Sequence, residues 1–240
     1  MEEKRVIDIK QEILSANDIA AEAFRRKLTA QKTLFVDIMS SPGAGKTTLL
    51  LALVRHLDHD ASIGVIEADI ASYVDAQKIK EAGIAVVQLQ THGICHVEMS
   101  MVSRGYRAFA GRRFDYLFLE NIGNLVCPAQ FDTGAHVRIM LLSVPEGYDK
   151  VYKYPLMFSA VDALVITKTD YLALNPDFDM DELEKQARIL NPTLEIFKTS
   201  ARTDKGIAEL ADWIAAKRNE SIGCDASATN ERDPDNKGGI

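Results

Sequence analysis

Short runs of apolar residues recur along the chain and alternate with longer segments of mixed polarity. Seven of these runs are rich in β-branched and aromatic residues, and each has the length of a single strand. Most are apolar nearly throughout, which is typical of strands buried on both faces of a parallel sheet. The predicted strands are TLFVDIMS (33–40), SIGVIEAD (62–69), IAVVQLQT (84–91), DYLFLEN (115–121), VRIMLLSV (137–144), ALVITKTD (163–170) and LEIFKTSA (194–201).

The segments between these strands are mostly long enough for helices, so the pattern predicts an α/β fold with three layers, α/β/α, around a mainly parallel sheet of about seven strands. Residues 1–32 carry apolar positions at helical spacing and are expected to form an amphipathic helix packed on the core. The last predicted helix spans residues 205–217, which closes a single domain over residues 33–217. Residues 218–240 are polar and are expected to be a disordered tail.

Composition narrows the possible partners. The chain has 240 residues, 47% of them hydrophobic, and a net charge of -7, opposite in sign to that of a typical nucleic-acid-binding protein. We therefore expect no nucleic-acid partner. No apolar run approaches the ~18 residues of a membrane helix, and the first ten residues lack the apolar core of a signal peptide. No membrane contact and a cytoplasmic location are expected.

The segment SSPGAGKTT (40–48) lies between the first predicted strand and the helix that follows it, where a phosphate-binding P-loop belongs. It departs from the pattern GxxxxGK[ST] because Ser40 replaces the first glycine. A glycine-containing turn with an exposed lysine is the alternative. As a P-loop, the backbone of Gly43, Ala44 and Gly45 would surround the phosphates, Lys46 would reach the β and γ phosphates, Thr47 would bind Mg²⁺ and Thr48 the α phosphate.

The segment TKTD (167–170) ends a predicted strand and resembles the guanine-reading NKxD motif of GTPases, with Thr167 in place of Asn. The Asp170 carboxylate would accept hydrogen bonds from N1–H and the 2-amino group of guanine, a donor pair that adenine lacks. Lys168 would lie along the base, and Ser200 and Ala201 occupy the place where GTPases bind guanine O6 through a backbone N–H. Alone, Asp170 could equally cap a helix.

Acidic residues follow two other predicted strands. Glu120 and Gly123 match an ExxG element that senses the γ phosphate through the glycine N–H. Asp69 ends its strand and could hold Mg²⁺ through water, and Asp75 follows in the next turn; either carboxylate could instead be a solvated helix cap. The predicted catalytic residues are therefore Lys46, Thr47, Asp69 and Glu120, with Asp75 and Gly123 among the nucleotide-binding residues.

Possible ligands for a softer metal lie in two loops. His92, Cys95 and His96 follow the third predicted strand, and Cys127 follows the fourth, so both loops are expected at the carboxyl edge of the sheet. Two thiolates and an imidazole suit Zn²⁺ or Ni²⁺, with a fourth ligand from His92, water or a second subunit. The alternative is that these cysteines simply fill the core. Cys224 has no possible partner nearby in the sequence and is interpreted as incidental.

Several segments together resemble the hydrogenase nickel-incorporation GTPases, the HypB family. They are MSSPGAGKT, Cys95 with His96, ENIGNLVCPAQFD, LLSVPEGYDK through KYPLMF, and TKTD, within a resemblance that spans residues 10–217. The family implies a P-loop GTPase of the SIMIBI class that binds GTP/GDP and Mg²⁺ and dimerises in its GTP state. It also implies Ni²⁺ or Zn²⁺ bound by Cys95, His96 and Cys127 across the dimer interface. The amino-terminal CxxCGC motif and histidine-rich stretch of many members are absent here.

The resemblance implies nickel delivery to the precursor of the [NiFe]-hydrogenase large subunit, together with a HypA-type nickel chaperone, and slow GTP hydrolysis. Other interpretations remain open. Accessory GTPases for urease or cobalamin enzymes share the fold and would differ in metal motif and partner. A P-loop kinase would transfer phosphate to a small molecule with little preference for guanine. A structural P-loop protein would bind nucleotide without any metal dependence.

Overall fold

The protein is built around one seven-stranded sheet in which every neighbouring pair of strands is parallel. The computed structural model describes residues 9–70 and 73–228. The strand order is β3-β2-β4-β1-β5-β6-β7. All seven predicted strands are confirmed, as β1 (Leu34–Ser40), β2 (Ile63–Asp69), β3 (Ala85–Gln90), β4 (Tyr116–Gly123), β5 (Val137–Ser143), β6 (Ala163–Thr167) and β7 (Glu195–Lys198).

The order of the strands places the first loop at a switch point of the topology. From β1 the chain moves outward to β2 and β3, returns to β4, and then crosses to β5 on the other side of β1. Because β1 lies between β4 and β5, the loop after β1 opens at the carboxyl edge where ligands bind in such sheets. Strand β1 is buried at all seven positions, which explains its continuous apolar sequence.

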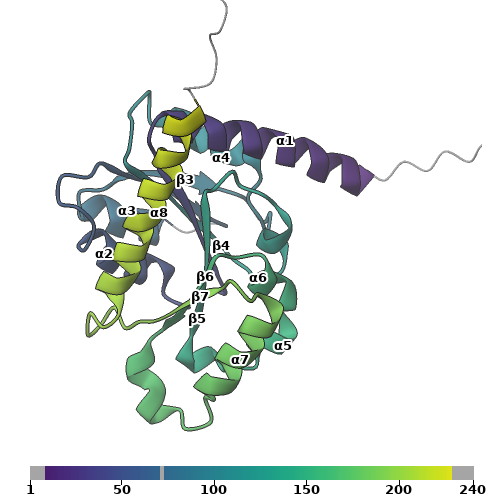
Figure 1. Ribbon diagram of the computed structural model, residues 1–240, viewed down its shortest axis with the longest axis vertical. Coiled ribbons are helices and arrows are strands. Elements are labelled where there is room, and N and C mark those ends of the chain that lie inside the picture. Colours follow the sequence, from purple (N-terminus) through teal and green to yellow (C-terminus); the bar gives the residue numbers. More distant parts are fainter. Residues whose placement is uncertain (1–8, 71–72, 229–240) are drawn as a thin grey trace, which may run out of the picture.

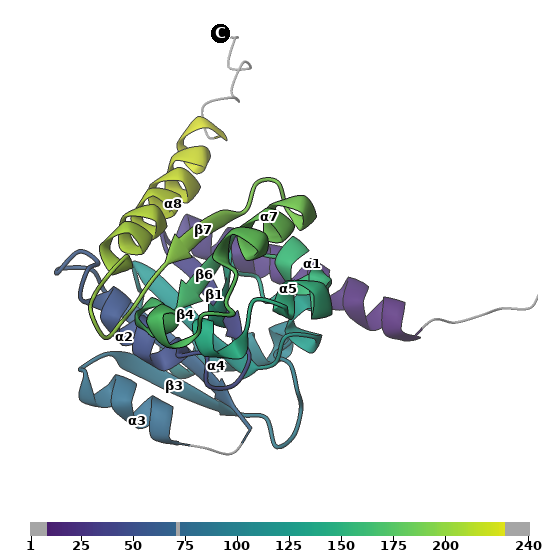
Figure 2. The ribbon, with the colours of Figure 1, turned by 90° about the horizontal axis from the view of Figure 1, so that it is seen from below.

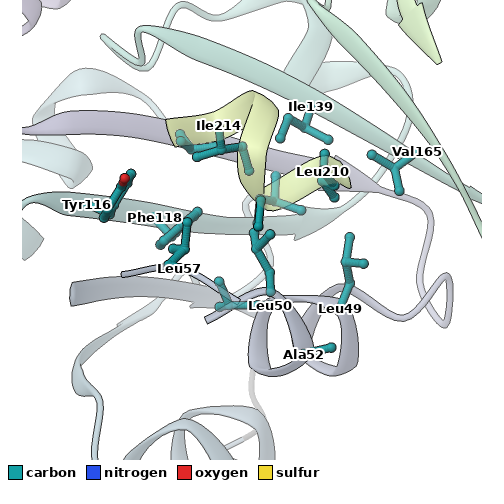
Figure 3. Packing of buried hydrophobic residues seen from close by; sticks show 14 of the residues in the cluster. Leu49, Leu50, Ala52, Leu57, Tyr116, Phe118, Ile139, Val165, Leu210 and Ile214 are labelled. Carbon is teal, nitrogen blue, oxygen red and sulfur yellow. The ribbon is translucent and has the colours of Figure 1, made fainter. Parts of the chain in front are cut away.

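Helices cover both faces of the sheet and form the outer layers (Figures 1 and 2). One face packs against α2 (Lys46–Val54), α3 (Val74–Glu81) and α8 (Ile207–Ala228). Figure 3 shows this core, in which side chains of α2 and α8 meet those of β4, β5 and β6. The other face packs against α1 (Ile9–Ala30), α4 (Met99–Ala108), α5 (Lys150–Lys153), α6 (Pro155–Ser159) and α7 (Met180–Leu190). Short 3₁₀ turns cover Cys127–Gln130 (η1), Val144–Glu146 (η2) and Thr169–Leu174 (η3).

The two terminal helices lie beside each other at one end of the sheet (Figure 1). The amino-terminal helix was expected over residues 1–32, and α1 buries Ala21, Phe24 and Leu28 against the core. Residues 1–8 lie outside the described part. In the described residues no helix has the length and apolar character needed to cross a membrane.

The predicted end of the last helix is wrong. It was expected at residue 217, with a disordered tail from 218, whereas α8 continues to Ala228 and includes Cys224. The Arg218 guanidinium donates to the Asp115 carboxylate and to the Lys32 carbonyl, so α8 makes polar contacts with the residues that precede β4 and β1 just past its predicted end. Because these contacts are polar, the part of α8 after residue 217 has no periodic apolar pattern from which a helix could be predicted. The rest of the predicted tail, residues 229–240, lies outside the described residues.

Candidate functional site: a nucleotide cavity beside a thiol pair

The loop between β1 and α2 has the backbone conformation that its glycines permit. Gly43 and Gly45 have φ angles of 79° and 99°, in the left-handed region that strains other residues, and Gly45 is the residue just before α2. The amino end of α2 therefore points its free N–H groups into the loop, which favours a bound phosphate. The Ser40 hydroxyl accepts a hydrogen bond from the Lys46 ammonium at 3.2 Å. Ser40 thus contributes a contact that glycine lacks.

Lys46, Thr47 and Glu120 meet at the phosphate end of this site. The Thr47 hydroxyl donates to Oε1 of Glu120 at 2.6 Å, and both side chains are buried. Burial lowers the pKa of Lys46, against the effect of Glu120 and the nearby acidic residues, and burial raises the pKa of Glu120. A buried ammonium and a buried carboxyl of shifted pKa are typical of functional sites. The structure brings these three predicted residues together, and their catalytic role stays a prediction.

A second buried carboxyl, Glu67, lies beside Glu120 and has no counterpart in the sequence-based site. Glu67 pairs with Glu120 in the register of β2 and β4, and it is only 3% exposed. Burial, together with the charge of Glu120, raises the pKa of Glu67 to about 8. The Oε2 atoms of both residues lack a hydrogen-bond partner among the described residues. A lone acidic residue inside an apolar strand was the signal that could have revealed it.

The phosphate cavity, of about 280 Å³, is lined by P-loop and acidic residues. Asp75 lies in this lining and forms an ion pair with Lys78 at 2.8 Å. Asp69 ends β2 outside the lining, although its charge reaches Lys46. The hydroxyl and carboxylate oxygens of this lining, among which Oε2 of Glu120 is buried without a partner in the described residues, are the ligand type that Mg²⁺ prefers. The residues therefore fit Mg²⁺. The lining comprises Gly43, Gly45, Lys46, Thr47, Thr48, Asp75, Lys78, Glu120 and Lys168.

Gly123 ends β4 directly against the P-loop. A Cβ atom at Gly123 would lie 2.9 Å from the ring of Pro42 and 3.0 Å from its backbone, so only glycine fits without displacing the loop. This close approach brings the backbone of residue 123 beside the phosphate end of the site. The structure thus places Gly123 against the phosphate loop, and its contact with a phosphate stays a prediction.

A second cavity, of about 200 Å³, continues the site toward β6 and β7. Asp170 lies in its wall, and the Ser200 hydroxyl donates to Oδ1 of Asp170 at 2.7 Å. The Lys168 ammonium donates to the Gly43 carbonyl at 2.7 Å and thereby joins the two cavities. The lining is Ala44, Gly45, Thr48, Leu49, Thr167, Lys168, Asp170, Tyr171, Thr199, Ala201 and Arg202. Thr199 and Arg202 were missed because no motif marks them.

Ser200 and Ala201, which were predicted together, have different contacts in the structure. The Ser200 backbone N–H donates to the Lys205 carbonyl at 2.9 Å, so it is already engaged and is not available to guanine O6. The hydroxyl of Ser200 instead orients Asp170. Of the two predicted residues, Ala201 alone lines the cavity, and its contact with guanine O6 stays a prediction.

Glu146 links the P-loop to η2 through hydrogen bonds, and it was not predicted from the sequence. Its carboxylate accepts hydrogen bonds from the backbone and hydroxyl of Ser143, in a capping box that opens η2. The other oxygen accepts from the hydroxyl of Ser41 in the P-loop. The S-x-x-E spacing within SVPEGYDK was the available signal.

Two of the predicted metal ligands meet at the carboxyl edge of the sheet. The sulfur atoms of Cys95 and Cys127 lie 3.0 Å apart, in the loops after β3 and β4. Cys95 is exposed and Cys127 is half-buried, so neither is a core filler. The Asn124 side chain donates to the Cys95 carbonyl at 3.0 Å and joins the two loops. Of the two cysteines, Cys127 lies four residues after Gly123 along the chain.

The structure does not bring the predicted histidine to the thiols. The His96 ring stacks on Phe131 with the ring centres 3.9 Å apart. His92 has a left-handed φ of 49° and lines a separate cavity of about 520 Å³ beside β3. In the described part of a single chain, no group of three His, Cys, Asp or Glu side chains is placed to hold a metal ion. One protomer therefore offers two clustered ligands of the predicted three.

Known proteins place the chain in a family. A family model described as the CobW/HypB/UreG nucleotide-binding domain matches residues 34–198. The Azotobacter chroococcum hydrogenase maturation factor HypB is 39% identical over 218 residues, covering 91% of this chain and 71% of that protein. The hydrogenase/urease maturation factor HypB of Helicobacter hepaticus is 38% identical over 219 residues, covering 90% of this chain and 89% of that protein.

Solved structures agree with this assignment. HypB from Helicobacter pylori, crystallised in complex with nickel, has a TM-score of 0.81 at 34% identity, covering 86% of this chain and 97% of that chain. HypB from Archaeoglobus fulgidus has a TM-score of 0.79 at 31% identity, covering 86% of this chain and 100% of that chain. Both the resemblance seen in the sequence and the predicted three-layer fold are confirmed. The chain belongs to the HypB branch of the CobW/HypB/UreG family of nucleotide-binding proteins.

Proposed function

We propose that this protein is a GTP-hydrolysing metallochaperone that binds Ni²⁺ or Zn²⁺ and assists nickel insertion into [NiFe]-hydrogenase. The observation that carries the proposal is the position of Cys127, four residues after Gly123, with its sulfur 3.0 Å from that of Cys95. A change in the γ-phosphate contact of Gly123 would move a metal ligand directly. Nucleotide state and metal affinity would then be coupled within one short loop.

The residues of the phosphate cavity support GTP hydrolysis. Lys46 and the amino end of α2 would neutralise the phosphates, and Thr47 and Asp75 would hold Mg²⁺, which supplies charge neutralisation when bound. Asp69, outside the lining, would reach the ion only through water. Glu120 accepts from Thr47 at 2.6 Å and keeps that hydroxyl oriented toward the site. Among the described residues no arginine lines this cavity, so no arginine is placed to stabilise the charge of the transition state, and slow turnover is expected.

The metal site supports a dimeric working form. Two thiols give an incomplete shell for Zn²⁺ or Ni²⁺, and an ion held by two exposed loops is easily handed on. We infer that a GTP-bound homodimer completes the shell by bringing together the thiol pairs of two subunits, with His96 released from Phe131. A HypA-type chaperone and the hydrogenase large-subunit precursor would be the donor and acceptor of the ion, in the cytoplasm.

Service to a second enzyme, urease, is an alternative with some support. Relatives in Helicobacter hepaticus and Helicobacter pylori are named hydrogenase/urease maturation factors. The metal site would be identical for both clients, because only the acceptor of the ion differs. A small-molecule kinase is less well supported, since the base end of the site is lined by the Asp170 carboxylate, which would discriminate against adenine.

The test combines turnover with metal loading. Purified protein is incubated with GTP and with ATP, and phosphate release is measured with and without Ni²⁺. We expect slow release from GTP alone, little from ATP, and Ni²⁺ binding that requires both thiols. Equal hydrolysis of ATP and GTP would contradict the GTPase. Metal binding that survives Cys95→Ala combined with Cys127→Ala would contradict the metal site.

A further inference from the structure

Asn17 lies on the buried face of α1, together with Ala21 and Phe24 at helical spacing. Unlike these apolar neighbours it carries an amide, and the residue is only 7% exposed. Nδ2 of Asn17 donates to the Asp132 carbonyl at 2.8 Å, and Oδ1 accepts from the Met99 backbone N–H at 2.9 Å. One partner is an acceptor and the other is a donor, so these contacts fix the orientation of the amide.

The two partners of Asn17 belong to the segments that carry the two thiols. Met99 is the first residue of α4 and directly follows the loop that contains Cys95. Asp132 lies between β5 and η1, the turn that begins with Cys127. A single buried side chain of α1 therefore joins the loop after β3 to the loop after β4, at the ends of these loops that lie farther along the chain.

Other contacts of α1 bind the same segment after η1. The Arg25 guanidinium donates to both carboxylate oxygens of Asp132, at 2.8 and 2.7 Å. Gly134 fits closely against α1 and α4, since a Cβ atom there would lie 3.0 Å from the Ala21 carbonyl oxygen and 3.1 Å from Sδ of Met99. The segment between η1 and β5 is therefore packed against both helices, and its position depends on how α1 is docked.

We propose that Asn17 is a positioning residue of the metal site, which holds the loops after β3 and β4 at the separation that brings Cys95 and Cys127 together. The inference rests on the proposed function, in which these two thiols bind the ion. It gives α1 a role in metal binding, although α1 precedes residues 34–198, which match the nucleotide-binding domain of the family. Asn124 joins the same loops beside the thiols, so the two loops are fixed at two points.

Loss of the amide should separate the two loops. Asn17→Leu keeps a side chain of similar length but leaves the Met99 N–H and the Asp132 carbonyl without their partner. Buried polar groups without a partner are costly, so both groups are expected to turn toward water, and the loops then move apart. Asn17→Asp keeps an acceptor for the Met99 N–H but sets an oxygen against the Asp132 carbonyl, so it releases the loop after β4 alone.

The test measures how well the thiols are presented as a pair, with phenylarsine oxide, which forms two As–S bonds and releases its oxygen with both thiol protons as water. Such a reagent binds tightly only where the second thiol lies within reach of the first. All proteins carry Cys224→Ala, so that two of the three cysteines remain, and free thiols are titrated without nucleotide or nickel. We expect arsenical binding about tenfold weaker for Asn17→Leu and about threefold weaker for Asn17→Asp. Ni²⁺ affinity should fall in the same order while GDP affinity stays within about twofold.

Thr29→Val is the matched control. Thr29 lies on the same helix, and its hydroxyl contacts the Arg25 carbonyl at 3.0 Å and Nε2 of His136 at 2.9 Å, at the other end of α1 from Asn17. It should leave arsenical and Ni²⁺ binding unchanged. The inference is overturned if Asn17→Leu binds the arsenical as tightly as the parent protein, or if Thr29→Val weakens binding equally. A parent protein that binds the arsenical but not Ni²⁺ would instead refute the proposed function.

Discussion

The nucleotide cavity and the thiol pair lie at the same edge of the sheet but differ in how completely one chain builds them. The nucleotide cavity is fixed by buried hydrogen bonds that join the P-loop to β4, β6 and η2. The thiol pair lies on two loops and is partly exposed, and in the described part of one chain no third ligand is placed beside it. The nucleotide cavity is therefore preorganised within one chain, whereas the thiol pair would need a further ligand to complete a metal site.

This difference between a preorganised nucleotide cavity and an incomplete metal site fits a protein that must release the metal ion it carries. Preorganisation strengthens binding because the ordering cost is met during folding. A site completed only in one conformational or oligomeric state binds tightly in that state alone. Gly123 touches the P-loop, and Cys127 follows four residues later. A change of nucleotide in the cavity could therefore move Cys127 and alter the metal affinity of the thiol pair.

The largest effect is expected from removing the ammonium of the rigid site. Lys46→Ala should weaken GDP binding at least about 100-fold, because a largely buried charge that faces the phosphates is lost. Lys78→Ala is the control: Lys78 lines the same cavity but pairs with Asp75 at the surface, and its loss should cost less than about threefold. Fluorescent-nucleotide titration measures both. Similar losses for the two variants would contradict the assignment of Lys46.

The base end should give the next largest effect. Asp170→Asn replaces one acceptor with a donor, so GDP should bind about 10- to 100-fold more weakly and xanthosine diphosphate more tightly. The measurement is competition of the two nucleotides against a fluorescent GDP analogue. An unchanged preference for guanine over xanthine would remove Asp170 from the base-reading site.

The incomplete site should respond to each thiol equally. Cys95→Ala and Cys127→Ala should each lower Ni²⁺ affinity by about tenfold or more while GDP affinity stays within about twofold. Cys224→Ala serves as the control, with unchanged metal binding. If loss of either thiol left the stoichiometry of Ni²⁺ intact, the pair would be structural.

The smallest effect is expected from Glu67, a buried carboxyl whose Oε2 atom has no hydrogen-bond partner among the described residues. The folded-state pKa of Glu67 is raised from 4.5 to about 8, so across that window the folded state holds a proton that the unfolded state has lost. Stability of the nucleotide-free protein should therefore fall as pH rises from 5 to 8. Glu67→Gln cannot ionise and should flatten this fall, gaining about 1 kcal/mol at pH 8.

Denaturant unfolding at pH 5 and at pH 8 measures this effect in chelator without nucleotide. Glu81→Gln, which alters an exposed carboxylate of α3, should leave the pH dependence unchanged. A Glu67→Gln variant with the pH profile of the unaltered protein would show that Glu67 is already ionised in the folded state.

The sequence predicts the sheet well because buried parallel strands are apolar throughout, and all seven runs became strands. It places the P-loop and Asp170 because local spacing encodes their geometry. It does not reveal Glu67, whose neighbour Glu120 lies 53 residues away and is set beside it only by the pairing of β2 with β4. Likewise, the stacking of His96 on Phe131 is a packing choice between loops that no motif encodes.

The most direct test of the coupling between the two sites is Ni²⁺ binding by equilibrium dialysis, with protein loaded with Mg-GDP or with a non-hydrolysable GTP analogue. The dimer fraction is recorded by light scattering in each state. We predict at least about tenfold tighter Ni²⁺ binding by the GTP-analogue dimer, and His96→Ala should abolish that gain without changing the GDP state. Equal Ni²⁺ affinity in both nucleotide states would contradict the coupling of nucleotide to metal.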